Sequence, residues 1–165
     1  MVETASPTFW ATLAASDFAS FVRENAWAYP LLETLHMVGL ALTVGGIILI
    51  DLRLMGLARG ISLSALARHV LRFVLLGSAI NVTTGLAMFA SDAVEFASNA
   101  SLQVKLVLSG LAFLNAGLYQ AGPARASAAW DRGVAPPSRV RLQGALSLML
   151  WLAVVTAGRM MAYLK

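Results

Sequence analysis

Four segments of the chain are each long and apolar enough to cross a lipid bilayer. The hydrocarbon core needs about 20 mostly apolar residues per helix, and only helices or closed barrels satisfy the backbone there. None of the segments shows the strict alternation of a barrel strand. They run approximately over Leu31–Ile50, Phe73–Ala90, Leu102–Gln120 and Leu142–Tyr163. The sequence therefore predicts an all-α integral membrane protein, a four-helix antiparallel bundle.

The composition agrees with this fold class. Of the 165 residues, 59% are hydrophobic and 12% are charged, and the mean hydropathy is +0.75, whereas soluble domains are about 45–50% apolar and about 25% charged. Cysteine is absent, which excludes disulfides, thiolate zinc sites and iron–sulfur clusters on this chain. The net charge of +4 comes mostly from two arginine-rich loops, so we expect no nucleic-acid binding.

Residues 1–29 precede the first span and are too interrupted to cross a membrane themselves. In this segment Phe18, Phe21, Val22 and Trp27 form one apolar side, which is typical of a short amphipathic helix that lies on a membrane interface. Such a helix would serve either as a surface clasp on the bundle or as a lid over a site. We expect residues 30–165 to form the bundle as one domain.

Arginine sets the predicted orientation. The loops after the first and third spans, with their flanks, are cytoplasmic by the positive-inside rule, because they hold Arg53, Arg59, Arg68, Arg72, Arg125, Arg132, Arg139 and Arg141. The loop after the second span carries Asp92 and Glu95 and no cation. We therefore expect that loop and both termini on the periplasmic side of a bacterial inner membrane.

Polar and ionisable residues inside the spans mark a candidate site, because they are costly in lipid. On the first span, His36 shares a face with Gly39 and Thr43 at helical spacing. At a rise of about 1.5 Å per residue, polar residues of all four spans reach one level in the outer half of the membrane. This set is Glu33, His36, Thr84, Met88, Lys105 and Arg159.

The other histidine, His69, falls at the opposite, cytoplasmic end in the stretch "LARHVLR". Counted along the helices, it lies roughly 15 Å or more from His36. The two histidines are therefore not expected to share a metal, and we interpret His69 as an interfacial residue.

An imidazole at membrane depth ligates haem iron, ligates copper or transfers a proton beside a quinone. Haem also needs a slot of small residues between helices and cations for its propionates. We assign His36 as axial ligand, Glu33 as the group that orients it, and Met88 as a candidate for the sixth position. Lys105 and Arg159 would pair with the propionates. The slot would be supplied by Gly39, Gly46, Gly77 and Ala112, and Thr43 and Thr84 are further candidate cofactor-binding residues. For copper the additional ligands would be Met88 and the Met160–Met161 pair.

A second interpretation needs no cofactor. A buried neutral histidine that is hydrogen-bonded to Glu33 or Thr84 would belong to a polar network that sets helix register. Gly45, Gly46 and Gly85 would then serve close helix packing. Asp51 and Arg53 are expected to form ion pairs with the arginines of their own loop.

The chain resembles an uncharacterised family of small bacterial four-helix membrane proteins. The resemblance rests on Trp27-x-Tyr29-Pro30, Glu33-x-x-His36 and Asp51-Leu-Arg53-Leu. More distantly, Leu35-His36 with Gly46, Arg53 and Lys105 is similar to four-helix b-haem proteins such as membrane protoporphyrinogen oxidase and the copper-resistance D proteins. In the oxidase family a first-helix histidine and a third-helix lysine belong to the functional region, and they correspond to His36 and Lys105. The chain departs from that pattern at Asp51, and it has no second histidine at the right depth.

The leading expectation is therefore a b-type haem protein that exchanges electrons with a quinone or a periplasmic partner. A copper-handling protein and a non-catalytic membrane subunit are the alternatives. We expect the protein to be surrounded by the lipid bilayer. Two forms of assembly stay open: a homo-oligomer of this chain, or a subunit of a larger membrane complex.

Overall fold

The structure is a computed structural model that describes residues 8–161 and 163. Helices make up most of this part of the chain, and it contains no strand. Four helices are long and apolar enough to span a membrane: α3 (Ala28–Leu54), α4 (Leu63–Ser91), α6 (Ala100–Ala121) and α7 (Ser138–Met160). The predicted all-α multi-pass bundle is confirmed, and three of the helices extend beyond the predicted spans at both ends.

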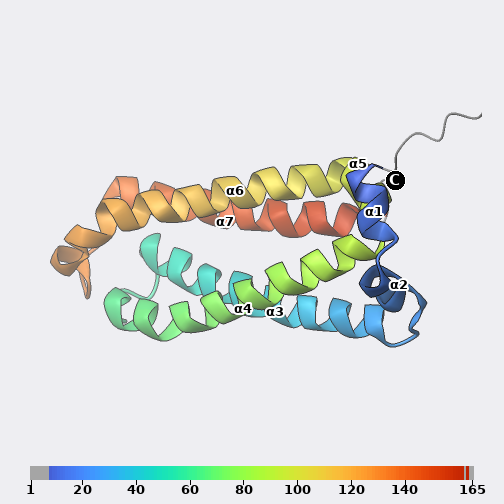
Figure 1. The fold of residues 1–165 in the computed structure, drawn as a ribbon. Helices are drawn as coiled ribbons and strands as arrows, with labels where there is room; N and C mark the ends of the chain where they lie inside the picture. The colour runs from blue at the N-terminus through green and yellow to red at the C-terminus, as the bar shows by residue number, and fades with distance from the viewer. Residues whose placement is uncertain (1–7, 162, 164–165) are drawn as a thin grey trace, which may run out of the picture.

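The four long helices form two antiparallel hairpins, α3 with α4 and α6 with α7 (Figure 1). The hairpins meet mainly where α3 packs against α7, whereas α4 and α6 have almost no contact. The two hairpins are therefore packed together on the side of α3 and α7 and loosely packed on the side of α4 and α6.

Small residues let α3 and α4 approach closely. A Cβ atom on Gly77 would lie 2.7 Å from the carbonyl oxygen of Gly39, and one on Gly46 would lie 2.5 Å from Val74 Cγ2. Close backbone approach through such residues is the usual way that helices associate in lipid. The packing role predicted for Gly46 is thus confirmed, but the one predicted for Gly45 is wrong, because a Cβ there meets no atom of the described residues within 4 Å.

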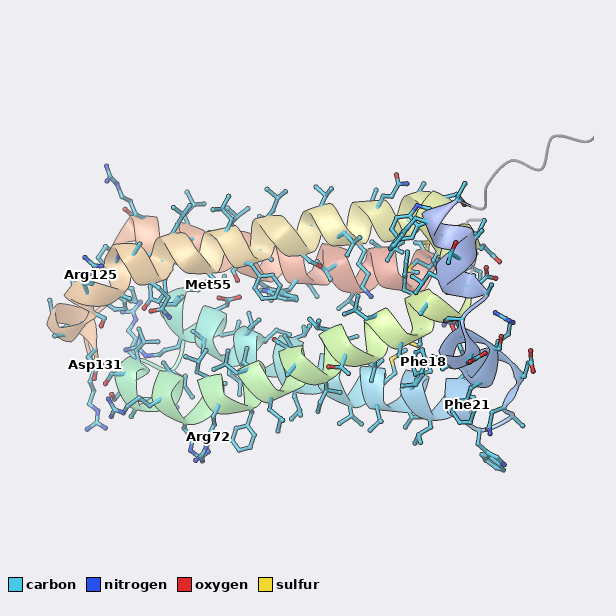
Figure 2. The ribbon with its side chains drawn as sticks, viewed as in Figure 1. Phe18, Phe21, Met55, Arg72, Arg125 and Asp131 are labelled. Carbon is cyan, nitrogen blue, oxygen red and sulfur yellow. The ribbon has the colours of Figure 1, made fainter. Side chains whose placement is uncertain are left out.

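Three short helices lie together at one end of the bundle, which we call the α5 end: α1 (Phe9–Ala14), α2 (Asp17–Glu24) and α5 (Ala93–Ser98). Val22 is buried, whereas Phe18 and Phe21 on the same helix are 54% and 59% exposed (Figure 2). The Arg23 guanidinium donates to the carbonyl oxygen of Ser91 at 2.7 Å. The N-terminal segment is therefore bound to the end of α4 as a surface clasp. It contains two short helices, whereas the sequence predicted one.

The opposite end, which we call the η1 end, carries a 3₁₀ helix, η1 (Pro123–Trp130), within the predicted loop between α6 and α7. The Trp130 side chain is buried against Leu54, Leu63 and Val140. This cluster packs the connection between α6 and α7 against the ends of α3 and α4, so the two hairpins are joined at this end.

The ion pairs predicted for Asp51 and Arg53 are wrong. Arg53 instead donates to backbone carbonyls, from Nε to Ile61 at 2.8 Å and from Nη2 to Asp131 at 2.9 Å. Asp51 is also buried, and its Oδ2 has no hydrogen-bond partner in the described part of the chain. Two residues two positions apart on a helix point in nearly opposite directions. Asp51 and Arg53 therefore face different parts of the surrounding chain.

Asp131 joins the two loops of the η1 end. Its carboxylate accepts hydrogen bonds from Ser62 Oγ at 2.6 Å and from the backbone N–H of Ser64 at 2.7 Å. These bonds, that of Ser62 first, hold the pKa of Asp131 below its ordinary value of 3.8. A carboxylate with a lowered pKa stabilises the folded state above its unfolded pKa, and this contribution is lost as the pH falls through the folded pKa.

We therefore expect an Asp131→Asn variant to unfold at a lower temperature than the native chain at neutral pH. The difference should shrink as the pH falls through the folded pKa, which lies below 3.8, because the native side chain becomes neutral as well. Thermal unfolding of both proteins in detergent across this range measures it. Equal stability at neutral pH would contradict the structure.

Candidate functional site

A pocket of about 110 Å³ lies at the α5 end, between the two hairpins. Its wall contains side chains from all four long helices or their ends and from α5. They are Tyr29, His36, Gly85, Met88, Phe89, Phe96, Leu102, Lys105 and Met161. Residues far apart in sequence thus meet at one level of the bundle, as the depth count predicts.

The His36 ring is held by Thr84 across the α3–α4 contact. His36 Nδ1 lies 2.9 Å from Thr84 Oγ1, and Thr84 Oγ1 lies 2.7 Å from the carbonyl oxygen of Ile80. A hydroxyl group has one hydrogen to donate, and the carbonyl oxygen can only accept it. The Thr84 oxygen therefore accepts from Nδ1–H, which assigns the tautomer of His36 and leaves the lone pair on Nε2.

The same arrangement occurs in many metal-ligating histidines. Such a histidine donates its other ring N–H to an oxygen, which fixes the ring orientation and the tautomer. The hydrogen bond from His36 to Thr84 confirms one of the two partners proposed for it. A Cβ atom on Gly85 would lie 3.4 Å from His36 Cε1, so the glycine gives the ring its space.

Lys105 enters the pocket from the other hairpin. Its side chain runs along Gly158 of α7, where a Cβ atom would lie 3.6 Å from Cδ, Cε and Nζ. Glycine at position 158 thus leaves room for the lysine to remain between the helices. The pocket has an imidazole on one hairpin and an amine on the other.

Two thioether side chains share the wall with His36. Met88 comes from α4, and Met161 directly follows the end of α7. Met160 and Met161 are adjacent in the sequence, and the sequence alone does not show which of the two faces the site. The structure assigns Met161 to the pocket.

Five of the predicted site residues do not line the pocket, and one of them, Thr84, forms the hydrogen bond with His36. Gly39 and Thr43 face α4, where Thr43 Oγ1 lies 3.4 Å from Ser78 Oγ. Glu33 is exposed and, among the described residues, has no hydrogen bond with His36, whose orientation comes from Thr84. Arg159 is exposed and donates to the Tyr163 hydroxyl at 2.9 Å.

Two aromatic residues that were not predicted from the sequence, Phe89 and Phe96, also line the pocket. Phe89 stacks with Phe96 of α5 at a centroid distance of 6.3 Å, and Trp10 of α1 meets the edge of Phe89 at 5.4 Å. A signal for α5 was present, because Asp92 and Asn99 are helix-capping residues on either side of it. A helix of six residues was too short to recognise by periodicity.

His69 lies near the start of α4, at the η1 end. It is exposed, and its Nδ1 lies 2.9 Å from Arg72 Nη2. In the described part of the chain no group of three His, Asp or Glu side chains is placed to hold a metal. A metal at His36 would therefore need other ligands, and the thioethers of Met88 and Met161 line the same pocket.

The side chains that line the pocket suit haem, but the pocket is too small to hold it. Histidine and methionine are axial ligands of b- and c-type iron, and the lysine suits a propionate. However, pockets for drug-sized ligands measure about 300–1,000 Å³, and this one measures about 110 Å³. Haem would enter only if the hairpins separated at the loosely packed α4–α6 side.

No protein-family model, curated protein or solved structure matches the chain. The resemblance to small four-helix membrane proteins therefore stays a prediction, and the function has to be argued from the pocket itself.

Proposed function

We propose that the protein is a multi-pass membrane protein of the bacterial inner membrane that binds one copper(I) ion at the pocket. The ligands are His36 through Nε2 and the thioether sulfurs of Met88 and Met161. By the arginine distribution the pocket and both termini lie on the periplasmic side. The protein would take up or hand over copper at the outer surface of the membrane.

The observation that carries this proposal is the hydrogen bond between His36 and Thr84. It leaves the Nε2 lone pair on a ring that forms the wall of a pocket with two methionines. Thioether and imidazole ligands select copper(I) over hard cations such as magnesium and calcium. A single ion also needs no more room than the pocket has.

A b-type haem is the second candidate, and Lys105 favours it. An ammonium group in the pocket wall repels a bound cation but attracts the propionate of a haem. Haem would supply one-electron transfer to a quinone or a periplasmic partner. Arg159 would serve as a second cation only after leaving Tyr163.

A Lys105→Gln variant separates these candidates, because the affinities for copper(I) and for haem should change in opposite directions. Removing the positive charge should tighten copper(I) binding several-fold, since a repulsion between like charges disappears. The same change should weaken haem binding. Anaerobic titration of the detergent-purified variant and native chain with copper(I), and separately with haem, measures both effects.

Direct metal analysis of the purified protein tests the proposal as a whole. After growth with added copper, we expect about one copper per chain and no Soret band. A Soret band with bands that sharpen on reduction by dithionite would favour the haem candidate. A protein with neither copper nor haem, and with no affinity for either, would leave His36 as part of a register-setting polar network and would contradict the proposal.

A further inference from the structure

A buried carboxyl group lies in the half of the bundle away from the copper pocket, at Asp51 near the end of α3. The residue is 4% exposed, and its Oδ2 atom has no hydrogen-bond partner in the part of the chain that the structure describes. Ser147 of α7 is a neighbour of the same carboxyl group. The proposed metal site does not use Asp51, because His36 lies fifteen residues earlier on α3, roughly 22 Å along the helix.

Asp51 sits in the contact that joins the two hairpins. A Cβ atom on Gly144 of α7 would lie only 3.1 Å from the backbone oxygen of Asp51, so the two helices pass close to each other there. One and two turns earlier, Ile47 and Val44 share the helical face of Asp51 and pack in a core cluster with Trp151 of α7. The carboxyl group is therefore placed among apolar side chains at the main contact between the hairpins.

The spanning helices supply no cation to this region. By sequence α4 has no charged residue between Arg72 and Asp92, α6 has none after Lys105, and α7 has none between Arg141 and Arg159. At the η1 end, seven arginines and one histidine are exposed: Arg59, Arg68, His69, Arg72, Arg125, Arg132, Arg139 and Arg141. None of them is buried beside the Asp51 carboxyl group.

The two other titratable groups near the end of α3 are engaged elsewhere. The Arg53 guanidinium donates to the backbone carbonyls of Ile61 and Asp131. Tyr119 of α6 packs against the cluster around Trp130. An ionised Asp51 would thus be a buried negative charge without a counter-ion among the described residues.

A proton is the ligand that fits this environment. A carboxylate that is buried without a cation is strongly disfavoured, and such a group becomes neutral instead. A proton needs no cavity, whereas a metal ion or an organic cation would need space at an oxygen that the surrounding chain covers. Ionisable side chains inside membrane-spanning helices commonly belong to proton pathways.

From these observations we propose that Asp51 is a proton-binding site inside the membrane, occupied while α3 and α7 are packed together and emptied when that contact opens. The O–H bond forms with a proton from water and breaks by returning the proton to water, so no other reactant takes part. Asp51 lies three residues before the end of α3, about 5 Å along the helix. By the arginine distribution this end is cytoplasmic, so the proton exchanges with cytoplasmic water.

The site makes the arrangement of the hairpins depend on cytoplasmic pH. Loss of the proton would leave a negative charge in the apolar contact between α3 and α7, which favours separation of the two helices. The proposal does not rest on copper or haem.

Infrared spectroscopy of the full chain tests the proton itself, in a maltoside detergent that has no carbonyl group. At about pH 6 an ordinary aspartate, with a pKa of about 3.9, is ionised. The carbonyl band of an un-ionised carboxylic acid at this pH therefore reports a carboxyl group that keeps its proton. We expect this band in the native chain and its loss in Asp51→Asn.

Two controls assign the band. Asp131→Asn should retain it, because the Asp131 carboxylate accepts hydrogen bonds from Ser62 and Ser64 and stays ionised. Aspartate labelled with carbon-13 in its carboxyl group should shift the band to lower frequency in the native chain. The isotope needs no substitution, so the test holds even where Asp51→Asn does not fold.

A single thiol tests the link between the proton and the helix contact. The chain has no cysteine, and Val44 is buried in the cluster with Trp151, so Val44→Cys places one thiol in the contact. Its rate of labelling by a maleimide is compared with and without Asp51→Asn between about pH 6 and about pH 8, below the ordinary thiol pKa of about 8.5. The thiolate fraction rises with pH in both proteins, but we expect a rise several-fold larger where Asp51 is present.

Each outcome decides one part of the proposal. A band that disappears in Asp51→Asn and shifts with the isotope supports the proton site, and the larger pH response with Asp51 supports its link to the contact. Absence of the band, or a band that persists in Asp51→Asn, overturns the proton site. Equal pH responses with and without Asp51 overturn the link to the packing of α3 against α7.

Discussion

A His36→Leu variant is expected to lose copper from the purified protein, with a fall in affinity larger than the roughly 10–100-fold typical of losing an outer-shell partner. Leucine has a similar bulk but no nitrogen, so it removes one of the three proposed ligands and the hydrogen bond to Thr84. Metal analysis and anaerobic copper(I) titration measure the loss.

The controls for this variant separate ligation from folding. Thr84→Val keeps the ligand but removes the oxygen that orients it, so we expect an intermediate loss of about 10–100-fold. His69→Leu and Met149→Leu change a histidine and a methionine that do not line the pocket, and both should retain full copper. Retention of copper in His36→Leu would show that the metal is bound elsewhere.

A Gly77→Ala variant is expected to be destabilised by about 1–3 kcal/mol, the range for forcing extra atoms into a packed contact. A single Cβ atom there would lie 2.7 Å from Gly39 O, from Leu42 Cβ and from Thr43 Oγ1, so α3 and α4 must move apart. Thermal unfolding in detergent measures the effect.

Gly45→Ala is the matched control, because a Cβ on Gly45 meets no described atom within 4 Å. There the alanine should be neutral or should stabilise the helix by up to about 1 kcal/mol. The two substitutions add the same methyl group to helical glycines of neighbouring membrane spans. Equal effects on stability would contradict the packing of α3 against α4.

Much of the fold follows from properties of each helix taken alone. Apolar length predicts the four spans, and helical spacing predicts the faces that carry His36 on α3 and Thr84 on α4. A constant rise per residue brings those residues to the level of Met88 and Lys105. These predictions need no knowledge of how the helices are turned against one another, apart from the antiparallel order.

The predictions that were wrong depend on how each helix is rotated about its own axis relative to its neighbours. Gly158 faces Lys105, and the next residue along a helix points about 100° away, so Arg159 is directed outward to Tyr163. The sequence shows that Glu33 lies one turn from His36, but not that Thr84 lies nearer. Likewise, the role of Arg53 depends on η1, whose contacts arise only when the two hairpins come together.

The central claim is that copper(I) is held by one imidazole nitrogen and two thioether sulfurs, and X-ray absorption spectroscopy of the copper-loaded protein tests it most directly. The account predicts a first shell with one nitrogen and two sulfur neighbours, and the loss of one sulfur in Met88→Leu and in Met161→Leu. A shell of nitrogen and oxygen neighbours without sulfur would contradict it.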